Sequence, residues 1–219
     1  MCMKYYFFLF LYLLATNLIA QDPWKDIYRE SAWEQRDTWQ RPADIISMLN
    51  LTSTSKVADV GSHEGYFSIK LAQAVRSGKV YAVDISKSKV EKLQEHLANR
   101  DIRNVEVILG KENDPGLPEN TLDAVLIVDT YHEMDHHTTI LKHIKTALKP
   151  GGRLLLCEPI SDERKALPRG DQEKKHELGI NFAITDLRTA GFKIIFQQES
   201  FIDRVKEKGD KMWVIICEK

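Results

Sequence analysis

The chain alternates between two spacings of apolar residues, which predicts a succession of strands and helices. Short apolar runs typical of strands lie at Val57 to Val60, Val80 to Ile85, Val105 to Leu109, Ala124 to Val128 and Arg153 to Cys157. Between them, apolar residues recur every three or four positions, as on one face of a helix. The fourth run is apolar at every position, which is typical of a central strand in a parallel sheet.

Polar and small residues predict where the helices begin and end. Helices are expected over residues 66–75, after Ser86 and after Asp135, with the last two side chains serving as helix caps. Pro150-Gly151-Gly152 is expected to end the helix that follows Asp135, and a further helix should end at Ala190-Gly191.

The last two apolar segments predict how the sheet closes. Lys193 to Phe201 and Met212 to Cys217 are separated only by the polar stretch DRVKEKGD. Because no crossover helix fits between them, the two strands must pair antiparallel. With the alternation before them, this predicts a three-layer α/β, Rossmann-like fold, whose mostly parallel seven-stranded sheet ends in a C-terminal antiparallel hairpin.

The N-terminus has a different pattern. A short basic start precedes Tyr5 to Ala20, which is almost entirely apolar, and Asp22-Pro23 then breaks the run. This is typical of a secretory signal peptide, with a retained membrane anchor as the alternative. Either predicts an exported domain, periplasmic or secreted, which touches a membrane only through an uncleaved N-terminal segment. The expected division is a signal peptide or anchor at 1–20, a helical segment or lid at 21–52 and the main domain at 53–219.

The composition indicates which class of molecule the protein is expected to bind. Hydrophobic residues make up 43% of the chain and charged residues 29%, with a formal net charge of -1. Without a basic stripe, nucleic acid is not a predicted partner, and a small molecule is expected instead. Cys157 and Cys217 lie in strand-like runs, so they predict buried apolar side chains and no disulfide framework. Nothing in the pattern predicts an oligomeric state.

Residues suited to ligand binding gather at the carboxyl ends of the first two predicted strands, where open α/β sheets bind their ligands. The segment VADVGSHEGYF places Asp59, Gly61 and Gly65 on a strand, a turn and the start of a helix. Glycines there let backbone amides approach a ligand closely. Asp84 lies at the tip of the second strand, where its carboxylate is placed to accept both hydroxyls of a ribose.

The glycine spacing excludes one cofactor class and favours another. His63 and Tyr66 occupy two of the three positions at which a nicotinamide dinucleotide site has glycine. The glycine turn, Asp84, NDPGLPENTLDAVLIVDTYHE, LKPGGRLLLCEP and AGF instead follow one another in a familiar order. In these motifs the chain resembles the class I S-adenosylmethionine-dependent methyltransferases, and it looks closest to bacterial, small-molecule members with RDTWQRP near the start. The resemblance covers nearly all of the chain after residue 20.

The resemblance implies S-adenosylmethionine as the cofactor and assigns residues to it. Gly61 and Gly65, with Asp59 before them, would face its methionyl and ribose portion, and Asp84 would bind the ribose. His63 stands where the family usually has its middle glycine. Histidine tolerates the left-handed backbone that the turn requires. Its side chain is then expected to project toward the methionine part of the cofactor.

The resemblance also implies residues further along the chain. Asn113 and Asp114, in the turn after the third strand, would face adenine, and Asp129, at the tip of the fourth strand, would lie beside the methionyl end. The alternative for Asp84 and Asp129 is a solvated strand end. The implied activity is in-line displacement, which transfers a methyl group to a small-molecule acceptor.

The segment YHEMDHH matches H-E-x-x-H, a zinc-protease signature. That site needs both histidines on one helical face. Here His132 follows a buried strand and Asp135 is predicted to start the next helix, so His132 and His136 would straddle a loop. No metal site is therefore predicted. By the resemblance, Tyr131, His132 and Glu133 would form the floor of the acceptor pocket.

A base is needed only if the acceptor must lose a proton. His132 is the first candidate, because the pKa of histidine suits proton transfer, and Glu133 and His176 follow. The alternative for His132 is a hydrogen-bonded loop residue that moves no proton. All three are predicted catalytic residues on this hypothesis.

The segment Trp33 to Arg41 is rich in aromatic and charged residues. It is a candidate lid over the cofactor that contributes Asp37, Trp39 and Gln40, and an amphipathic helix packed on the sheet edge is the alternative. Three functions thus remain open. They are an exported methyltransferase, a non-enzymatic exported domain of the same fold that binds a nucleoside-like ligand, and a zinc metalloprotease. The histidine at position 63 is the best support for the second.

Overall fold

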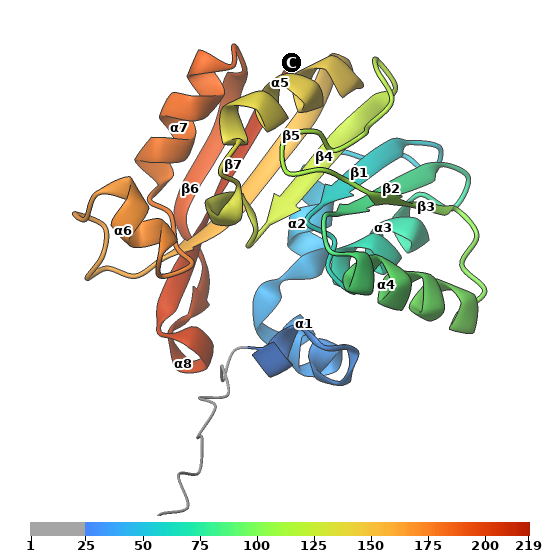
Figure 1. The fold of residues 1–219 in the computed structure, drawn as a ribbon, viewed down its shortest axis with the longest axis horizontal. Helices are drawn as coiled ribbons and strands as arrows, with labels where there is room; N and C mark the ends of the chain where they lie inside the picture. Colours follow the sequence, from blue (N-terminus) through green and yellow to red (C-terminus); the bar gives the residue numbers. More distant parts are fainter. Residues whose placement is uncertain (1–24) are drawn as a thin grey trace, which may run out of the picture.

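The computed structural model describes residues 25–219, which fold around one seven-stranded sheet (Figure 1). The strands are β1 (Lys56–Val60), β2 (Lys79–Asp84), β3 (Val105–Leu109), β4 (Leu122–Val128), β5 (Leu148–Ile160), β6 (Lys193–Arg204) and β7 (Asp210–Glu218). Their order across the sheet is β3-β2-β1-β4-β5-β7-β6. Strand β7 runs antiparallel to β5 and β6, and the other neighbours are parallel. The predicted fold class and closing hairpin are confirmed.

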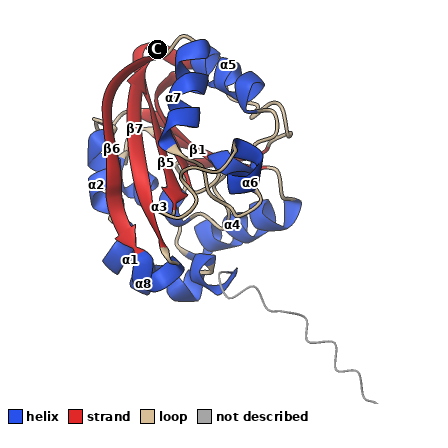
Figure 2. Ribbon diagram, turned by 90° about the vertical axis from the view of Figure 1, so that its left-hand side faces the viewer, coloured by secondary structure: helices blue, strands red, loops and turns tan. Residues whose placement is uncertain are grey.

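Helices cover both faces of this sheet (Figure 2). In chain order they are η1 (Lys25–Tyr28), η2 (Glu30–Ala32), α1 (Trp33–Gln40), α2 (Pro42–Met48), α3 (Tyr66–Ala74), α4 (Lys87–Asn99), η3 (Tyr131–Glu133), α5 (His137–Ala147), α6 (Arg169–Glu173), α7 (Ile180–Thr189) and α8 (Val205–Lys208). On one face, α1, α2 and α3 bury apolar side chains such as Ile45 and Leu71 against the sheet. On the other, α5 and α7 do the same with Leu141 and Leu187. The three-layer prediction is therefore confirmed.

Two predicted helix caps are corrected by the structure. Helix α5 begins at His137 with His136 at its N-cap, so Asp135 is not the capping residue. The chain first makes the short helix η3 and packs Met134 against the core, which delays the start of α5. Ser86 does occupy the N-cap position of α4, but its side chain makes no capping hydrogen bond and instead lies 3.1 Å from the hydroxyl of Ser88.

The boundary between α5 and β5 also differs from the prediction. The helix ends at Ala147, and the predicted stop at Pro150-Gly151-Gly152 already belongs to β5, which is longer at both ends than expected. Cys157 and Cys217 are free and buried, as predicted.

The signal peptide or anchor predicted for residues 1–20 lies outside the described residues. Within the described part of the chain, no helix combines the length and apolar character needed to cross a membrane.

Candidate functional site

The turn between β1 and α3 has the backbone conformation that its glycines predict. Gly61 has φ +82° and Gly65 has φ +98°, values that strain any residue with a Cβ. A Cβ added at Gly61 would lie 2.2 Å from Cγ2 of Thr130, and one at Gly65 would lie 2.2 Å from Cδ1 of Leu93. Both positions therefore require glycine for conformation and for space. The turn lies directly against the loop that follows β4.

The carboxylate of Asp84, at the end of β2, is tied to this turn. Its Oδ2 accepts a hydrogen bond from the backbone N–H of His63, and its Oδ1 accepts one from the backbone N–H of Ser86, both at 2.8 Å. Each carboxylate oxygen can accept a further hydrogen bond. Asp84 can therefore bind two ligand hydroxyls while it holds the turn. His63 has φ +49°, so it adopts the left-handed backbone expected of it.

Burial favours the neutral forms of two side chains beside the turn. It raises the pKa of the buried Asp59 carboxyl to about 6, although the hydroxyl of Ser68 donates a 2.6 Å hydrogen bond to it. Burial, together with the charge of Lys89, lowers the pKa of the half-buried His63. The imidazole is therefore neutral at physiological pH and adds no positive charge at the turn.

Two exposed apolar side chains flank Asp84, and sequence reasoning missed both. Ile85 follows Asp84 and is 61% exposed, while Leu109 ends β3 and is 53% exposed. Asp84 and Leu109 are register partners across the sheet, so the three residues lie at one edge. Apolar side chains beside a few polar groups are typical of a small-molecule site. The available signal was the apolar residue at the last position of each of these two predicted strands.

The turn after β3 makes mainly local contacts. Oδ1 of Asp114 accepts a hydrogen bond from the backbone N–H of Gly116 at 2.8 Å and lies 3.9 Å from Nδ1 of His143 in α5. Asn113 is exposed. The adenine contact predicted for Asn113 and Asp114 stays a prediction.

Asp129, at the end of β4, is the centre of a buried ion cluster. Arg204 donates to its Oδ2 at 2.7 Å and also binds Asp210, and the hydroxyl of Tyr28 donates to the same Oδ2 at 2.6 Å. Burial opposes ionisation, but Arg204 and Lys208 hold the pKa of Asp129 well below its usual range. Protein groups therefore already neutralise the carboxylate, and its predicted contact with a methionyl group stays a prediction.

The cluster includes residues that no local sequence pattern marks. Tyr28 comes from η1 and Arg204 from the end of β6, so the fold alone brings them together. Nearby, the buried guanidinium of Arg36 lies 4.0 Å from the centre of the Tyr66 ring and donates to Oε1 of Gln40 at 3.2 Å. Burial lowers the pKa of Arg36. A buried cation near the glycine turn suits an anionic ligand group.

The three residues predicted to form a lid belong to α1, which packs on the domain. Trp39 and Gln40 are buried, and Nε2 of Gln40 lies 3.5 Å from Sδ of Met212. Asp37 accepts hydrogen bonds from the hydroxyl of Tyr66 at 2.6 Å and from Nζ of Lys70 at 2.9 Å. These contacts are those of the alternative, a helix packed against the sheet and α3. The lid role stays a prediction.

A wholly buried carboxylate, that of Glu158 in β5, orders the loop after β4. Its Oε1 accepts hydrogen bonds from the backbone N–H groups of Thr130 at 2.7 Å and Tyr131 at 2.8 Å, and its Oε2 lies 2.6 Å from Nδ1 of His132. Tyr131 is itself buried, and its hydroxyl donates to Asp186 in α7 at 2.9 Å. The side chain of Tyr131 is thus engaged in packing, and its place in an acceptor pocket stays a prediction.

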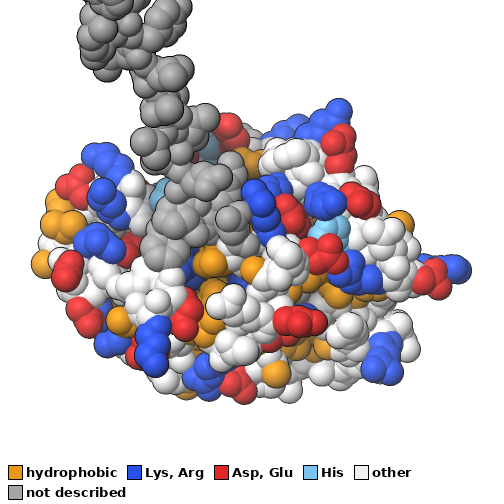
Figure 3. Space-filling view, turned by 90° about the horizontal axis from the view of Figure 1, so that it is seen from below, with side chains coloured by type: hydrophobic (Ala, Val, Ile, Leu, Met, Phe, Trp, Pro, Cys, Tyr) orange, Lys and Arg blue, Asp and Glu red, His pale blue; other side chains and the backbone are white. Residues whose placement is uncertain are grey.

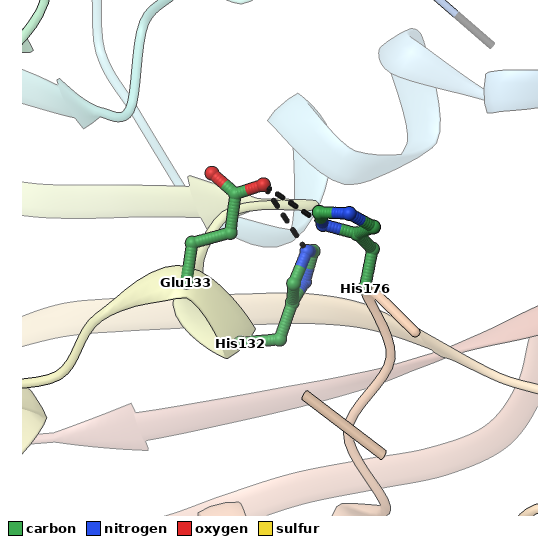
Figure 4. A group of neighbouring side chains, drawn as sticks. All are labelled: His132, Glu133 and His176. Carbon is green, nitrogen blue, oxygen red and sulfur yellow. Dashed lines mark hydrogen bonds and ion pairs between the residues drawn. The ribbon is translucent and has the colours of Figure 1, made fainter. Parts of the chain in front are cut away.

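The three predicted catalytic residues do lie together (Figure 4). Oε1 of Glu133 is 3.7 Å from Nε2 of His132 and 3.2 Å from Nδ1 of His176. Burial alone would lower the pKa of His132, but the charge of Glu158 and the hydrogen bond with Glu133 raise it to about 10. The hydrogen bond with His132 lowers the pKa of Glu133 despite its partial burial. His132 therefore carries its proton at neutral pH, in contrast to the titrating base that the sequence suggested.

The two histidines of the zinc-protease pattern, His132 and His136, do not come together as metal ligands. His136 is the exposed N-cap residue of α5, and the group whose ligand atoms all lie within 4.8 Å of one another consists of His132, Glu133 and His176. His176 comes from the segment between α6 and α7. The expectation that His132 and His136 do not share a helical face is confirmed.

The surroundings of the site add two observations. On the face drawn in Figure 3, basic and acidic side chains are interspersed, without a patch of one sign. A separate cavity of about 350 Å³ lies at the opposite edge of the sheet, lined by residues such as Ser55, Asp123 and Gly152. It contains none of the predicted site residues.

Comparison with known proteins gives a family for most of this domain. Residues 51–188 match the family model described as a methyltransferase domain. Over 116 residues the chain is 31% identical to a demethylmenaquinone methyltransferase of Geobacillus sp. (strain WCH70), which covers 52% of this chain and 50% of the relative. The chain thus spans about half the length of the curated relatives that it matches.

Solved structures show the same fold. A SAM-dependent methyltransferase from Aquifex aeolicus has a TM-score of 0.72 and 23% identity, covering 90% of this chain and 97% of its own. The cyclase SpnF also has a TM-score of 0.72, with 17% identity over 82% of this chain and 80% of its own. The methyltransferase family supports S-adenosylmethionine as the cofactor, while these neighbours show the fold alone, and the cyclase shows that one fold can serve a different reaction.

Proposed function

Because the chain belongs to the family of methyltransferase domains, we propose that it transfers a methyl group from S-adenosylmethionine to a small-molecule acceptor. The observation that carries the proposal is the coupling of the glycine turn to Asp84 through the 2.8 Å hydrogen bond from the backbone N–H of His63. It places a bare backbone surface next to a carboxylate that can still accept hydroxyl groups.

The residues around this pair fit the parts of the proposed cofactor. Asp84 would accept hydrogen bonds from the ribose hydroxyls, and the exposed side chains of Ile85 and Leu109 would contact the faces of the adenine ring. Arg36 supplies a buried cation for the carboxylate of the methionine portion. A neutral His63 avoids repulsion of the positively charged sulfur.

The cofactor supplies a methyl group on a positively charged sulfur, which is already activated for displacement. The protein then mainly has to align the acceptor and exclude water. His132 is a poor general base because its pKa of about 10 keeps it protonated at neutral pH. We therefore assign it a positioning role, in which Glu158 fixes its ring and Glu133 forms an ion pair with its other nitrogen at 3.7 Å.

Calorimetric titration of the full chain with S-adenosylmethionine and with its demethylated product tests the proposal. We expect both to bind, and Asp84→Asn to weaken binding at least tenfold, about 1.4 kcal/mol. Asp123→Asn is the matched control, because Asp123 also accepts a backbone hydrogen bond, from Lys56 at 2.7 Å, but lies at the start of β4. A folded chain that binds neither compound would overturn the proposal. Binding without methyl transfer to any acceptor would instead favour the non-enzymatic alternative.

We also propose export of the domain, supported by the apolar run at residues 5–20. Fractionation of cells that produce the chain, with and without three charged substitutions in this run, tests it. We expect the native chain outside the cytoplasm and the substituted chain inside. Equal distribution of the two would contradict export.

A further inference from the structure

The side chains of His132, Glu133 and His176 converge from two separate segments of the chain (Figure 4). One possible ligand atom from each lies within 4.8 Å of the other two. The separations to Oε1 of Glu133 are 3.7 Å from Nε2 of His132 and 3.2 Å from Nδ1 of His176. Ligands about 2.0–2.2 Å from one metal ion stand about 3–3.6 Å from one another. A metal ion between these three atoms would therefore need only small side-chain movements.

The orientation of His132 is fixed by a second carboxylate. Nδ1 of His132 lies 2.6 Å from the wholly buried Glu158, which is itself held by two backbone N–H groups. This leaves Nε2 directed toward Glu133 and His176. A carboxylate that binds the outer ring nitrogen is the usual partner of a metal-bound histidine, because it sets the ring orientation and raises ligand basicity.

A contribution to folding stability does not explain why Glu133 and His176 lie beside each other. The side chains of Glu133 and His176 are 59% and 72% exposed. An exposed ion pair of this kind contributes little to folding, about 0–1 kcal/mol. Their exposure instead leaves room on one side of the group for a further ligand. Two imidazoles and one carboxylate with an open position form a donor set used for catalytic zinc and for ferrous iron.

We propose that His132 Nε2, Glu133 and His176 bind one divalent transition-metal ion, which displaces the proton of Nε2 into solvent, with Glu158 orienting His132. This ligand set differs from the zinc-protease pattern, in which His136 would be a ligand and Glu133 would not. Thr130, two residues before His132, lies against Gly61, so the proposed metal site is joined to the glycine turn by a short stretch of chain. If the proposed methyl transfer holds, that position takes an oxygen or nitrogen donor of the acceptor, and His132 acts as a ligand.

Titration of untagged, chelator-treated full chain with Co²⁺ and Zn²⁺ tests the site, using calorimetry and the visible absorption of bound Co²⁺. We expect one equivalent to bind. His176→Ala should weaken binding at least about 100-fold, and Glu158→Gln about 10–100-fold. His176 is exposed, so its variant should fold, and circular dichroism checks this. His136→Gln is the matched control and should bind as the native chain does.

Three results would overturn the metal site: native affinity in His176→Ala, an equal loss in His136→Gln, or the absence of any binding. Titration of the metal-free chain with S-adenosylmethionine separates this from the proposed function. Cofactor binding without metal binding refutes only the metal site, while metal binding without cofactor binding refutes only the proposed methyltransferase.

Discussion

The substitution Glu158→Gln tests the electrostatic account of the loop after β4 most directly. The glutamine oxygen can still accept the backbone N–H groups of Thr130 and Tyr131, which Glu158 accepts at 2.7 and 2.8 Å. Its amide group, however, carries no charge and can only donate toward Nδ1 of His132. The variant therefore keeps the shape of the site and removes its charge-assisted hydrogen bond.

The pKa of His132 sets an upper limit on how far Glu158→Gln can lower the free energy of unfolding. It lies at about 10 in the folded chain, against 6.5 for an unperturbed histidine, and this difference corresponds to at most about 5 kcal/mol. Removal of one partner from a buried ion pair costs about 3–5 kcal/mol. We expect the free energy of unfolding of the variant to fall by about 3–5 kcal/mol at pH 6.

The pH dependence provides a sharper test. Because folding raises the pKa of His132, its stabilising contribution is fully present below about 6.5 and is lost as pH rises through about 10. The difference in unfolding free energy between native chain and variant should therefore shrink over that window. Guanidinium denaturation of the metal-free chains from pH 6 to 10.5 measures it. A difference below about 1 kcal/mol at pH 6, or one that does not change with pH, would refute the reasoning.

Three further predictions concern stability. Arg204→Met leaves the buried carboxylate of Asp129 without its main cation, so the free energy of unfolding measured in urea should fall by about 3–5 kcal/mol. A loss under about 1 kcal/mol would contradict this account of the cluster. Gly61→Ala combines a positive φ with a clash against Thr130, whereas an added Cβ at Gly151 has nothing within 4 Å. Gly61→Ala should therefore lower the free energy of unfolding by at least about 2 kcal/mol more than Gly151→Ala. Equal decreases in the melting temperatures of the two variants would argue against the turn geometry. Burial raises the pKa of Asp59 to about 6 in the folded chain, so the protonated carboxyl stabilises the fold below about pH 4 and this contribution is lost above pH 6. Asp59→Asn should therefore be up to about 3 kcal/mol more stable than the native chain at pH 8. Its free energy of unfolding, measured by denaturation, should also vary less with pH.

Local sequence patterns were enough to predict the fold and the positions of part of the candidate site. Strand and helix periods place Gly61, Gly65 and Asp84 at one sheet edge, because the carboxyl ends of parallel strands meet there. The positive φ angles of both glycines agree with the turn expected of them. Helix starts were less predictable, since Met134 packs into the core and delays α5.

Long-range contacts were not predictable in this way. The sequence offered no sign that Arg204 and Tyr28 would neutralise Asp129, because these partners come from opposite ends of the chain. Glu158 directly follows the apolar run Arg153 to Cys157 in β5, and nothing local indicates that it holds His132. The raised pKa of His132 could not be foreseen for this reason, since the carboxylate that raises it comes from β5 and not from the segment around His132.

The ion cluster around Asp129 has a consequence for how the protein is made. Its members come from η1, from the tip of β4 and from the β6–β7 hairpin. Synthesis proceeds from the N-terminus, so Asp129 leaves the ribosome well before Arg204 and Asp210. Until the last hairpin emerges, the buried pocket for this carboxylate has no cation and cannot close without an uncompensated charge. The residues of the glycine turn are made earlier, whereas this ion cluster is completed only after Arg204 and Asp210 have been synthesised.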